Sequence, residues 1–245
     1  MGPTAAGKTG VAVDLVERLP LDIISVDSAL VYRGMDIGSA KPDADTLARA
    51  PHRLIDIREP EQPYSAADFR ADAWREMEAI WAAGRTPLLV GGTVLYFKAL
   101  LEGLAPLPAA DETVRATLAE RARREGWPAL HQELVSVDPV AAERIKPTDP
   151  QRIQRALEVY EQSGVAISDW YARADQAGFG YRLLKIALIP GRREVLHERI
   201  EMRFAQMLAA GLVDEVRQLY ARGDLGHQHS AIRAVGYRQI WEHLE

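Results

Sequence analysis

Apolar positions in the first hundred residues alternate between short continuous runs and helical spacing. Continuous runs occupy residues 21–26 and 87–90, and each ends in polar or glycine residues. Such short runs are typical of buried parallel strands. Helical spacing covers residues 11–19, 65–84 and 95–101. The order of helix and strand with short turns predicts a parallel α/β sheet with helices on both faces.

The pattern changes twice further along the chain. Residues 30–64 are irregular and rich in turn formers, although the stretch 53–57 fits a further strand. From residue 111 onward we find only helical periodicity, which predicts helices at 111–126, 130–135 and 149–164.

A strand pattern returns at residues 183–189, and helical spacing follows at 193–210 and 213–222. This return divides the chain into an α/β core and a helical part. We expect a discontinuous core formed by residues 1–112 and 182–245, and an all-helical insertion at 113–181.

The chain begins with the pattern G-x-x-x-x-G-K-[ST], which is typical of a phosphate-binding loop. Glycines let backbone N–H groups converge on an anion, and the following helix adds the positive end of its dipole. Lys8 adds a charge for the outer phosphate, and the Thr9 hydroxyl can ligate Mg²⁺. The alternative is a glycine-rich turn with a surface lysine. The residues predicted to bind a polyphosphate are Gly2, Pro3, Thr4, Ala5, Ala6, Gly7, Lys8 and Thr9.

This motif makes the core P-loop NTPase-like. A loop of this kind follows a buried strand, and only Met1 precedes it here, so we expect that a first strand is missing from the sequence. The last residues, 240–244, have the pattern of a helix without a stop signal, so we also expect a missing C-terminal segment.

Composition narrows the class of protein. The 245 residues include no cysteine, which excludes disulfides and cysteine-ligated zinc, and no apolar run approaches the ~20 residues that span a bilayer. The net charge of −5 argues against bulk attraction to nucleic acid. Residues 182–245 nevertheless carry 10 basic against 8 acidic side chains, so local basic clusters can hold such a partner. We expect a cytoplasmic monomer without membrane contact.

Function in parallel sheets lies at the carboxyl ends of the strands. Asp27 follows the first apolar run and is expected within reach of the phosphate loop. On position alone, it is a candidate for a carboxylate that organises Mg²⁺ or for a helix cap. The segment 91–93, Gly-Gly-Thr, lacks the acidic residue of a magnesium-holding strand. It either lets a backbone approach closely or simply starts a helix.

Two basic segments of the second half are candidate nucleic-acid contacts. Arg152 and Arg155 lie at i and i+3 on one predicted helix face, and residues 233–238 carry two further arginines. Solvated helix surface is the commoner explanation for such pairs. Within the second segment, the step from Gly236 to Tyr237 could bring an aromatic ring to a base.

Five segments taken together resemble the bacterial tRNA dimethylallyltransferase family, also called tRNA isopentenyltransferases. The segments are residues 2–9, 25–38, 91–96, 149–158 and 232–239. The resemblance implies transfer of a dimethylallyl group from dimethylallyl diphosphate to N6 of the adenosine 3′-adjacent to the anticodon, with Mg²⁺ at the diphosphate. The sequence departs from the family at both ends.

The same resemblance assigns roles to residues. Thr4–Thr9 would hold the diphosphate, with Thr9 and Arg203 acting over it, and Asp27 would be the general base on N6. The helical insertion would grip the anticodon stem-loop. The residues implied to contact tRNA are Asp27, Ser28, Ala29, Leu30, Thr93, Arg115, Gln151, Arg152, Ile153, Gln154, Arg155, Arg233, Ala234, Val235, Gly236, Tyr237 and Arg238.

Three other functions compete with this one. A small-molecule kinase would use ATP on the same loop, but it would need an acidic magnesium strand that the sequence does not offer. An adenylate isopentenyltransferase would prenylate free nucleotides, and the insertion at 113–181 favours tRNA over that acceptor. A phosphate-binding module without catalysis leaves the position of Asp27 unexplained.

Overall fold

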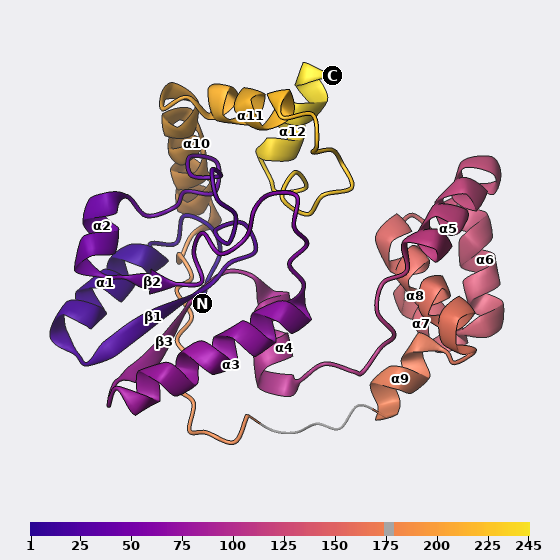
Figure 1. Ribbon diagram of the computed structural model, residues 1–245, viewed down its shortest axis with the longest axis horizontal. Coiled ribbons are helices and arrows are strands. Elements are labelled where there is room, and N and C mark those ends of the chain that lie inside the picture. The colour runs from indigo at the N-terminus through magenta and orange to yellow at the C-terminus, as the bar shows by residue number, and fades with distance from the viewer. Residues whose placement is uncertain (174–178) are drawn as a thin grey trace. The chain divides into compact units, whose positions relative to one another are not determined.

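The computed structural model describes residues 1–173 and 179–245 (Figure 1). Its chain divides into two compact units. Unit 1 consists of Met1–Leu101 and Gly180–Glu245, and unit 2 is Glu102–Phe179. The helical unit therefore begins before the expected residue 113. The reason is that Leu107 already packs on the core of unit 2 and the Pro108 carbonyl accepts a 2.6 Å hydrogen bond from Arg155.

The described part of unit 1 contains a parallel sheet of three strands in the order β2-β1-β3. The strands are β1 (Leu21–Val26), β2 (His52–Arg53) and β3 (Thr86–Gly91). β1 pairs with β3 along its whole length, from Leu21 opposite Thr86 to Val26 opposite Gly91. This register brings the residues that follow both strands to the same end of the sheet, which is where the sequence predicted the site.

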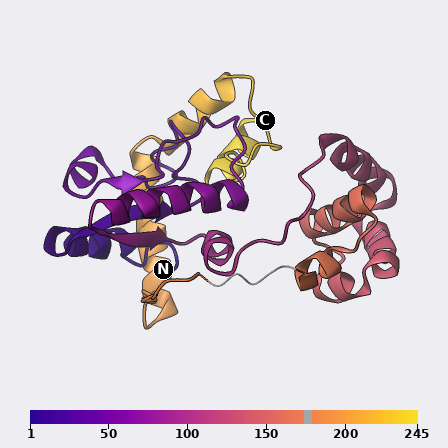
Figure 2. The ribbon, with the colours of Figure 1, turned by 60° about the horizontal axis from the view of Figure 1, so that its bottom comes forward.

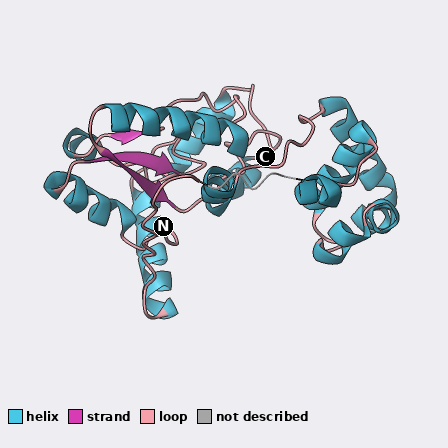
Figure 3. Ribbon diagram, turned by 90° about the horizontal axis from the view of Figure 1, so that it is seen from below, coloured by secondary structure: helices cyan, strands magenta, loops and turns pink. Residues whose placement is uncertain are grey.

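Helices cover both faces of this sheet (Figures 2 and 3). α1 (Lys8–Arg18) and α3 (Ala66–Ala82) both contact β1 and β3. α3 begins with a capping box, in which Ser65 and Asp68 satisfy each other's backbone N–H groups. α4 (Val94–Glu102) follows β3, and the short α2 (Ala44–Arg49) was not predicted. The predicted P-loop-like α/β fold class is confirmed.

Two expected strands are wrong. β2 ends at Arg53 because Leu54 and Asp56 adopt positive φ angles of 64° and 55°, which extended strand backbone does not have. The stretch 183–189 forms no strand. Its backbone pairs with Met1 alone among the described residues, through Met1 N to Ile186 O at 2.7 Å and Leu188 N to Met1 O at 2.8 Å.

Three helices follow in unit 1. No residue of α10 (Arg193–Ala209) is fully buried, whereas α11 (Leu212–Ala221) and α12 (Tyr237–Leu244) pack together. Tyr220 of α11 meets Trp241 of α12 edge to face, with ring centroids 4.9 Å apart. The predicted helices at 193–210 and 213–222 are confirmed to within a residue or two.

The regular elements in the described part of unit 2 are all helices. It contains α5 (Glu112–Glu125), α6 (Trp127–Val137), α7 (Pro139–Arg144), α8 (Pro150–Ser163) and α9 (Ile167–Arg173). The sequence missed α7 and α9, which are short. The core of the unit includes Leu118, Leu130, Leu134, Ile153 and Leu157, which are almost fully buried.

α8 follows its sequence signals closely. Asp149 caps its N-terminus by accepting from the Arg152 N–H, Pro150 takes the first position, and Gly164 ends the helix in the left-handed conformation with a φ of 66°. Among residues 1–173 and 179–245, no helix has the length and apolar content that crossing a bilayer requires.

Candidate active site

The phosphate loop turns sharply into α1. Ala5 and Gly7 adopt positive φ angles of 58° and 85°, and Gly7 precedes the helix without any side-chain cap on the first N–H groups. Lys8 bends back so that its Nζ donates to the Pro3 carbonyl at 2.7 Å. Gly2 lies so close to the segment 183–189 that a Cβ there would come within 2.3 Å of the Leu188 carbonyl oxygen. Uncapped N–H groups beside an ammonium group are suited to bind an anion.

Three charged side chains influence one another at this loop. Burial lowers the pKa of Lys8, the Asp27 carboxylate opposes that shift, and the Arg203 guanidinium adds to it. Burial likewise lowers the pKa of Arg203, again opposed by Asp27. Arg203 comes from α10, far along the chain, yet it contributes to the same electrostatic environment as the loop. Two partly desolvated cations beside one carboxylate favour the binding of a further anion.

The Asp27 carboxylate is held by the backbone that follows it. Its Oδ1 accepts from the N–H groups of Ala29 at 2.9 Å and Leu30 at 3.4 Å. The residue is only half-buried, and its position directly after β1 is the one that the sequence predicted. Ala29 and Leu30 therefore contribute to the site through their backbone N–H groups, which orient the carboxylate. An oriented, accessible carboxylate is able to accept a proton.

The glycines at the end of β3, Gly91 and Gly92, let backbones approach closely, which decides between the two explanations left open by the sequence. A Cβ on Gly91 would lie 2.0 Å from the Val26 carbonyl oxygen, so only glycine fits there. A Cβ on Gly92 would lie 3.3 Å from the Gly2 carbonyl oxygen and 3.8 Å from Lys8 Nζ. The end of β3 thus lies directly against the phosphate loop.

Thr93 links β3 to the turn that carries Asp27. Its Oγ1 accepts from the Ser28 N–H at 3.1 Å and lies 3.4 Å from Ser28 Oγ, while its own N–H donates to the Val26 carbonyl at 3.2 Å. The hydroxyl groups of Thr93 and Ser28 therefore share one surface of the site. Both are placed at the same edge of the sheet as the carboxylate.

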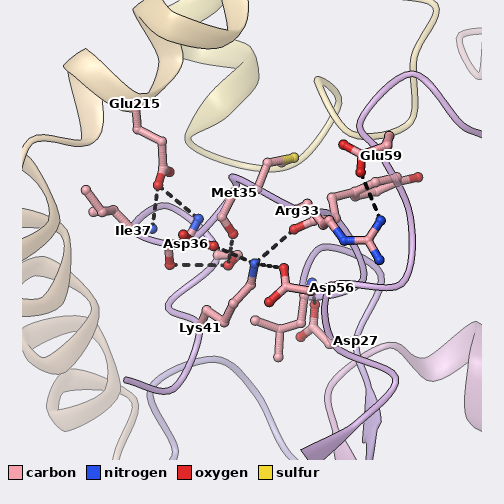
Figure 4. A network of polar contacts seen from close by, with 12 residues as sticks. Asp27, Arg33, Met35, Asp36, Ile37, Lys41, Asp56, Glu59 and Glu215 are labelled. Carbon is pink, nitrogen blue, oxygen red and sulfur yellow. Dashed lines mark hydrogen bonds and ion pairs between the residues drawn. The ribbon is translucent and has the colours of Figure 1, made fainter. Parts of the chain in front are cut away.

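The loop after Asp27 depends on a buried lysine that sequence reasoning missed (Figure 4). The Lys41 side chain is only 6% exposed. Its Nζ donates to the Tyr32 carbonyl at 2.9 Å and to carboxylate oxygens of Asp36 and Asp56, each at 2.5 Å. A buried ammonium group with three oxygen partners fixes the path of residues 32–41. The pattern Lys-Pro in an irregular stretch gave no signal of this role.

The segment 233–238 is divided between surface and core. Arg233, Val235 and Arg238 are exposed, and Arg233 Nε donates to the His227 carbonyl at 3.0 Å. Tyr237 is 0% exposed, so the expectation that its ring approaches a base is wrong. The ring lies in the core, where a base cannot stack on it. Ala234 and Gly236 are partly buried.

In unit 2, two predicted tRNA contacts share one buried carboxylate. Glu158 is 0% exposed and accepts from Arg115 Nε at 2.9 Å, from Arg155 at 2.8 Å and from the Asp111 N–H at 2.8 Å. Burial alone would raise the pKa of Glu158, but these hydrogen bonds outweigh it and lower the pKa. The solvated-surface explanation therefore fails for Arg155.

The other predicted contacts in α8 differ from one another. Arg152 is exposed and pairs with Asp149 at 3.3 Å, so it remains a surface cation, and Gln151 is exposed beside it. Gln154 donates from Nε2 to the Arg115 carbonyl at 3.0 Å. Ile153 is 0% exposed in the core of the unit, and its expected contact with tRNA is therefore wrong for the side chain.

A cleft of about 410 Å³ lies elsewhere in unit 1, between residues 52–58 and α3. Its charged residues satisfy each other, as in the pairs of Arg53 with Glu76 and Arg75 with Asp72, at 2.8 and 2.7 Å. None of the phosphate-loop residues lines it. It therefore adds nothing to the candidate site.

A sequence model of the family described as IPP transferase matches residues 30–245. The chain belongs to the IPP transferase family. The resemblance predicted from five sequence segments is thereby confirmed. The phosphate loop and Asp27 precede the matched residues, but structural likeness to solved proteins covers them as well.

Two solved bacterial structures are similar to this IPP transferase along nearly its whole length. The full-length tRNA isopentenylpyrophosphate transferase of Bacillus halodurans is 39% identical, with 99% of this chain and 75% of that chain covered and a TM-score of 0.67. The tRNA delta(2)-isopentenylpyrophosphate transferase of Staphylococcus epidermidis is 32% identical, covering 100% and 78%, with a TM-score of 0.66.

A eukaryotic dimethylallyltransferase acting on tRNA shares the fold. It is 23% identical over 98% of this chain and 59% of that chain, with a TM-score of 0.75. The fold is therefore common to bacterial and eukaryotic proteins whose sequences have diverged widely.

Proposed function

We propose that this transferase moves a dimethylallyl group from dimethylallyl diphosphate to N6 of the adenosine 3′-adjacent to the anticodon of a tRNA. The observation that carries the proposal is the placement of Asp27, an oriented carboxylate whose charge acts on both Lys8 of the phosphate loop and Arg203. A base and an anion site at one end of the sheet suit a transfer in which a diphosphate leaves. Membership of the IPP transferase family supports the same reaction.

On the diphosphate side, the protein's part is to bind and to stabilise charge. The uncapped N–H groups at the start of α1 would hold the phosphate oxygens, with Lys8 and Arg203 beside them. When the C1–O bond of the dimethylallyl group breaks, negative charge grows on the leaving diphosphate. Donors that are already in place stabilise that charge without reorganising.

On the acceptor side, the difficulty is the weak nucleophile. The lone pair of the exocyclic adenine amine is delocalised into the ring, so N6 attacks well only if its proton leaves as the new N6–C1 bond forms. Asp27 is the group that would take this proton. General base catalysis of this kind contributes ~10²–10⁴ in rate.

We propose that Mg²⁺ accompanies the diphosphate. In the described residues no cluster of three or more His, Asp or Glu side chains is able to hold a metal by itself. Magnesium at phosphate sites takes one or two protein oxygens and completes its shell with phosphate and water. Thr9 offers an exposed hydroxyl in the first turn of α1, which fits that arrangement. Bound there, the ion would neutralise charge on the diphosphate.

The tRNA side of the proposal rests on exposed and oriented arginines. Arg233 and Arg238 in unit 1, and Arg152 in unit 2, are exposed cations suited to phosphate contacts. Arg115 and Arg155 keep guanidinium groups at fixed positions on Glu158. The target base must leave its stack, which costs a few kcal/mol, and backbone contacts help to offset that cost. A cytoplasmic location and a monomeric state stay predictions.

The test is to incubate the protein with labelled dimethylallyl diphosphate, and separately with ATP labelled on its outer phosphate. Each donor is offered no acceptor, free adenine nucleotide, or tRNA. We expect label from dimethylallyl diphosphate to enter tRNA alone, at the adenosine next to the anticodon. Transfer to the free nucleotide with none to tRNA, or phosphate transfer from ATP, would overturn the proposal.

A further inference from the structure

A carboxylate from a distant helix holds the loop that follows Asp27. Glu215, in the first turn of α11, accepts three consecutive backbone N–H groups, and Figure 4 shows the two from Asp36 and Ile37. Its Oε2 binds Asp36 N at 2.9 Å and Ile37 N at 2.8 Å, and its Oε1 binds Gly38 N at 3.1 Å. Successive N–H groups that converge on one anion form a specific cradle, and bonds to a charged acceptor are the stronger kind.

The fourth donor on Glu215 is the hydroxyl of Tyr237, at 2.5 Å from Oε1. The Tyr237 ring is fully buried, and burial, followed by the contact with Glu215, raises the pKa of its hydroxyl well above the ordinary value. The phenol therefore stays protonated and acts as a donor. The loop packs directly on the ring, because a Cβ on Gly38 would lie 2.5 Å from it.

Hydrogen bonds continue from this cradle to Asp27. Lys41 ties Asp36 to Asp56, whose own N–H donates to the Leu30 carbonyl at 3.2 Å. The Leu30 N–H in turn donates to the Asp27 carboxylate. Glu215, the loop 32–41 and the candidate base are thus joined by one run of polar contacts, most of which Figure 4 shows.

Tyr237, the partner of Glu215, is also part of the exposed basic segment 233–238. Tyr237 is the first residue of α12, and residues 233–236 immediately precede it. Arg233, Val235 and Arg238 of this segment are exposed. The hydroxyl of Tyr237 is therefore a direct link between the surface that presents these arginines and the loop that orients Asp27.

We propose that Glu215 and Tyr237 are positioning residues. They hold the loop that follows Asp27 in a fixed position relative to segment 233–238. A tRNA held at that segment would then present its adenine amine to the carboxylate at the correct distance. The inference rests on the proposed function, since it assigns to that segment a tRNA contact. It predicts that loss of the contact between Glu215 and Tyr237 slows the transfer step while leaving diphosphate binding intact.

The test compares Tyr237→Phe, which removes only the hydroxyl, with Tyr220→Phe as the matched control. Tyr220 lies on α11 and packs on α12, so it belongs to the same pair of helices without touching Glu215 in the contacts described above. Glu215→Gln removes the charge and keeps the shape. For each protein one measures the single-turnover transfer rate with saturating tRNA, the affinity for dimethylallyl diphosphate, and amide hydrogen exchange over residues 27–41.

We expect Tyr237→Phe to slow single-turnover transfer by about tenfold, and Glu215→Gln by more, because bonds to a charged group are lost. Diphosphate affinity should stay within about twofold of wild type, and exchange should quicken at residues 36–38 and at 29–30. Tyr220→Phe should change none of these. A wild-type rate in Tyr237→Phe would overturn the proposal, as would unchanged exchange in both variants of the pair. If wild-type protein modified no tRNA, the proposed function would fail, and the exchange result would still decide whether the pair orders the loop.

Discussion

Asp27 in unit 1 and Glu158 in unit 2 are both carboxylates held by several donors, but they are satisfied differently. Backbone N–H groups of Ala29 and Leu30 bind Oδ1 of the half-buried Asp27, and Oδ2 accepts no hydrogen bond in the described part of the chain. Glu158 is fully buried, and both of its oxygens accept from guanidinium groups. The first keeps an oxygen for chemistry, whereas the second is structural. The partners of a carboxylate decide its role.

The arginines of the two regions show the same contrast. Arg115 and Arg155 are paired with Glu158. Arg203 forms no ion pair among the described residues, and burial lowers its pKa. A partly desolvated cation without a partner is stabilised by an anionic ligand, which a paired one does not need. Arg203 in unit 1 therefore keeps a charge that an anionic ligand can satisfy, whereas Glu158 in unit 2 already satisfies Arg115 and Arg155.

The largest effect is expected at the unpaired arginine. Arg203→Ala removes a donor to the diphosphate as charge develops on it, so the single-turnover transfer rate should fall by about 10²-fold or more. Arg217→Ala is the control, because Arg217 is an exposed residue of α11 that pairs with Asp214. A rate equal to that of wild type in Arg203→Ala would remove this residue from the reaction.

A smaller effect, on stability, is expected at the buried carboxylate. Glu158→Gln leaves two guanidinium groups with a neutral partner, which should lower the free energy of unfolding by about 2 kcal/mol in denaturant titrations. The pKa of Glu158 in the folded protein lies below its ordinary value of 4.5. Its contribution is thus complete above pH 4.5 and is lost as the pH falls through the folded value. Equal stability of both proteins at neutral pH would contradict a structural role.

The smallest effect separates the two arginines of α8. Arg152→Ala removes an exposed cation, so the slope of log affinity for tRNA against log salt should become shallower by about one charge. Arg155→Ala should change that slope less, because Glu158 already neutralises the Arg155 guanidinium. Binding titrations at four or five salt concentrations measure both. A larger change for Arg155 would mean that its guanidinium contacts phosphate despite the pair.

Sequence patterns predicted the elements whose signals are local. The strand that ends before Asp27 and the helix that follows Gly7 were recognisable because a buried strand needs an apolar run and an anion loop needs glycine. The stretch 183–189 has the same apolar run but lacks neighbouring strands in the described chain, so its pattern predicted a strand wrongly. The stretch 53–57 failed because positive φ angles at Leu54 and Asp56 have no sequence signature.

Local sequence patterns could not predict which residues hold the loop beside the candidate site. Glu215 reaches residues 177–179 positions earlier in the chain, and Lys41 reaches Asp56 across an irregular loop. Both side chains have the appearance of ordinary surface charges in the sequence. An aromatic residue after glycine is compatible with base stacking, so the sequence left open a contact of Tyr237 with a base, and only the fold shows that its ring is in the core.

The claim that Asp27 is the base is tested most directly by the single-turnover rate of Asp27→Asn, measured beside its affinity for dimethylallyl diphosphate and the Mg²⁺ dependence of that affinity. Asparagine keeps the shape and an acceptor but takes no proton. We predict a rate lower by ~10²-fold or more, with diphosphate affinity and its Mg²⁺ dependence nearly intact. Thr9→Ala is the control for the metal role, and it should instead weaken both the diphosphate affinity and the Mg²⁺ dependence of that affinity. Transfer by Asp27→Asn at the wild-type rate, or a loss confined to Mg²⁺ dependence, would contradict the account.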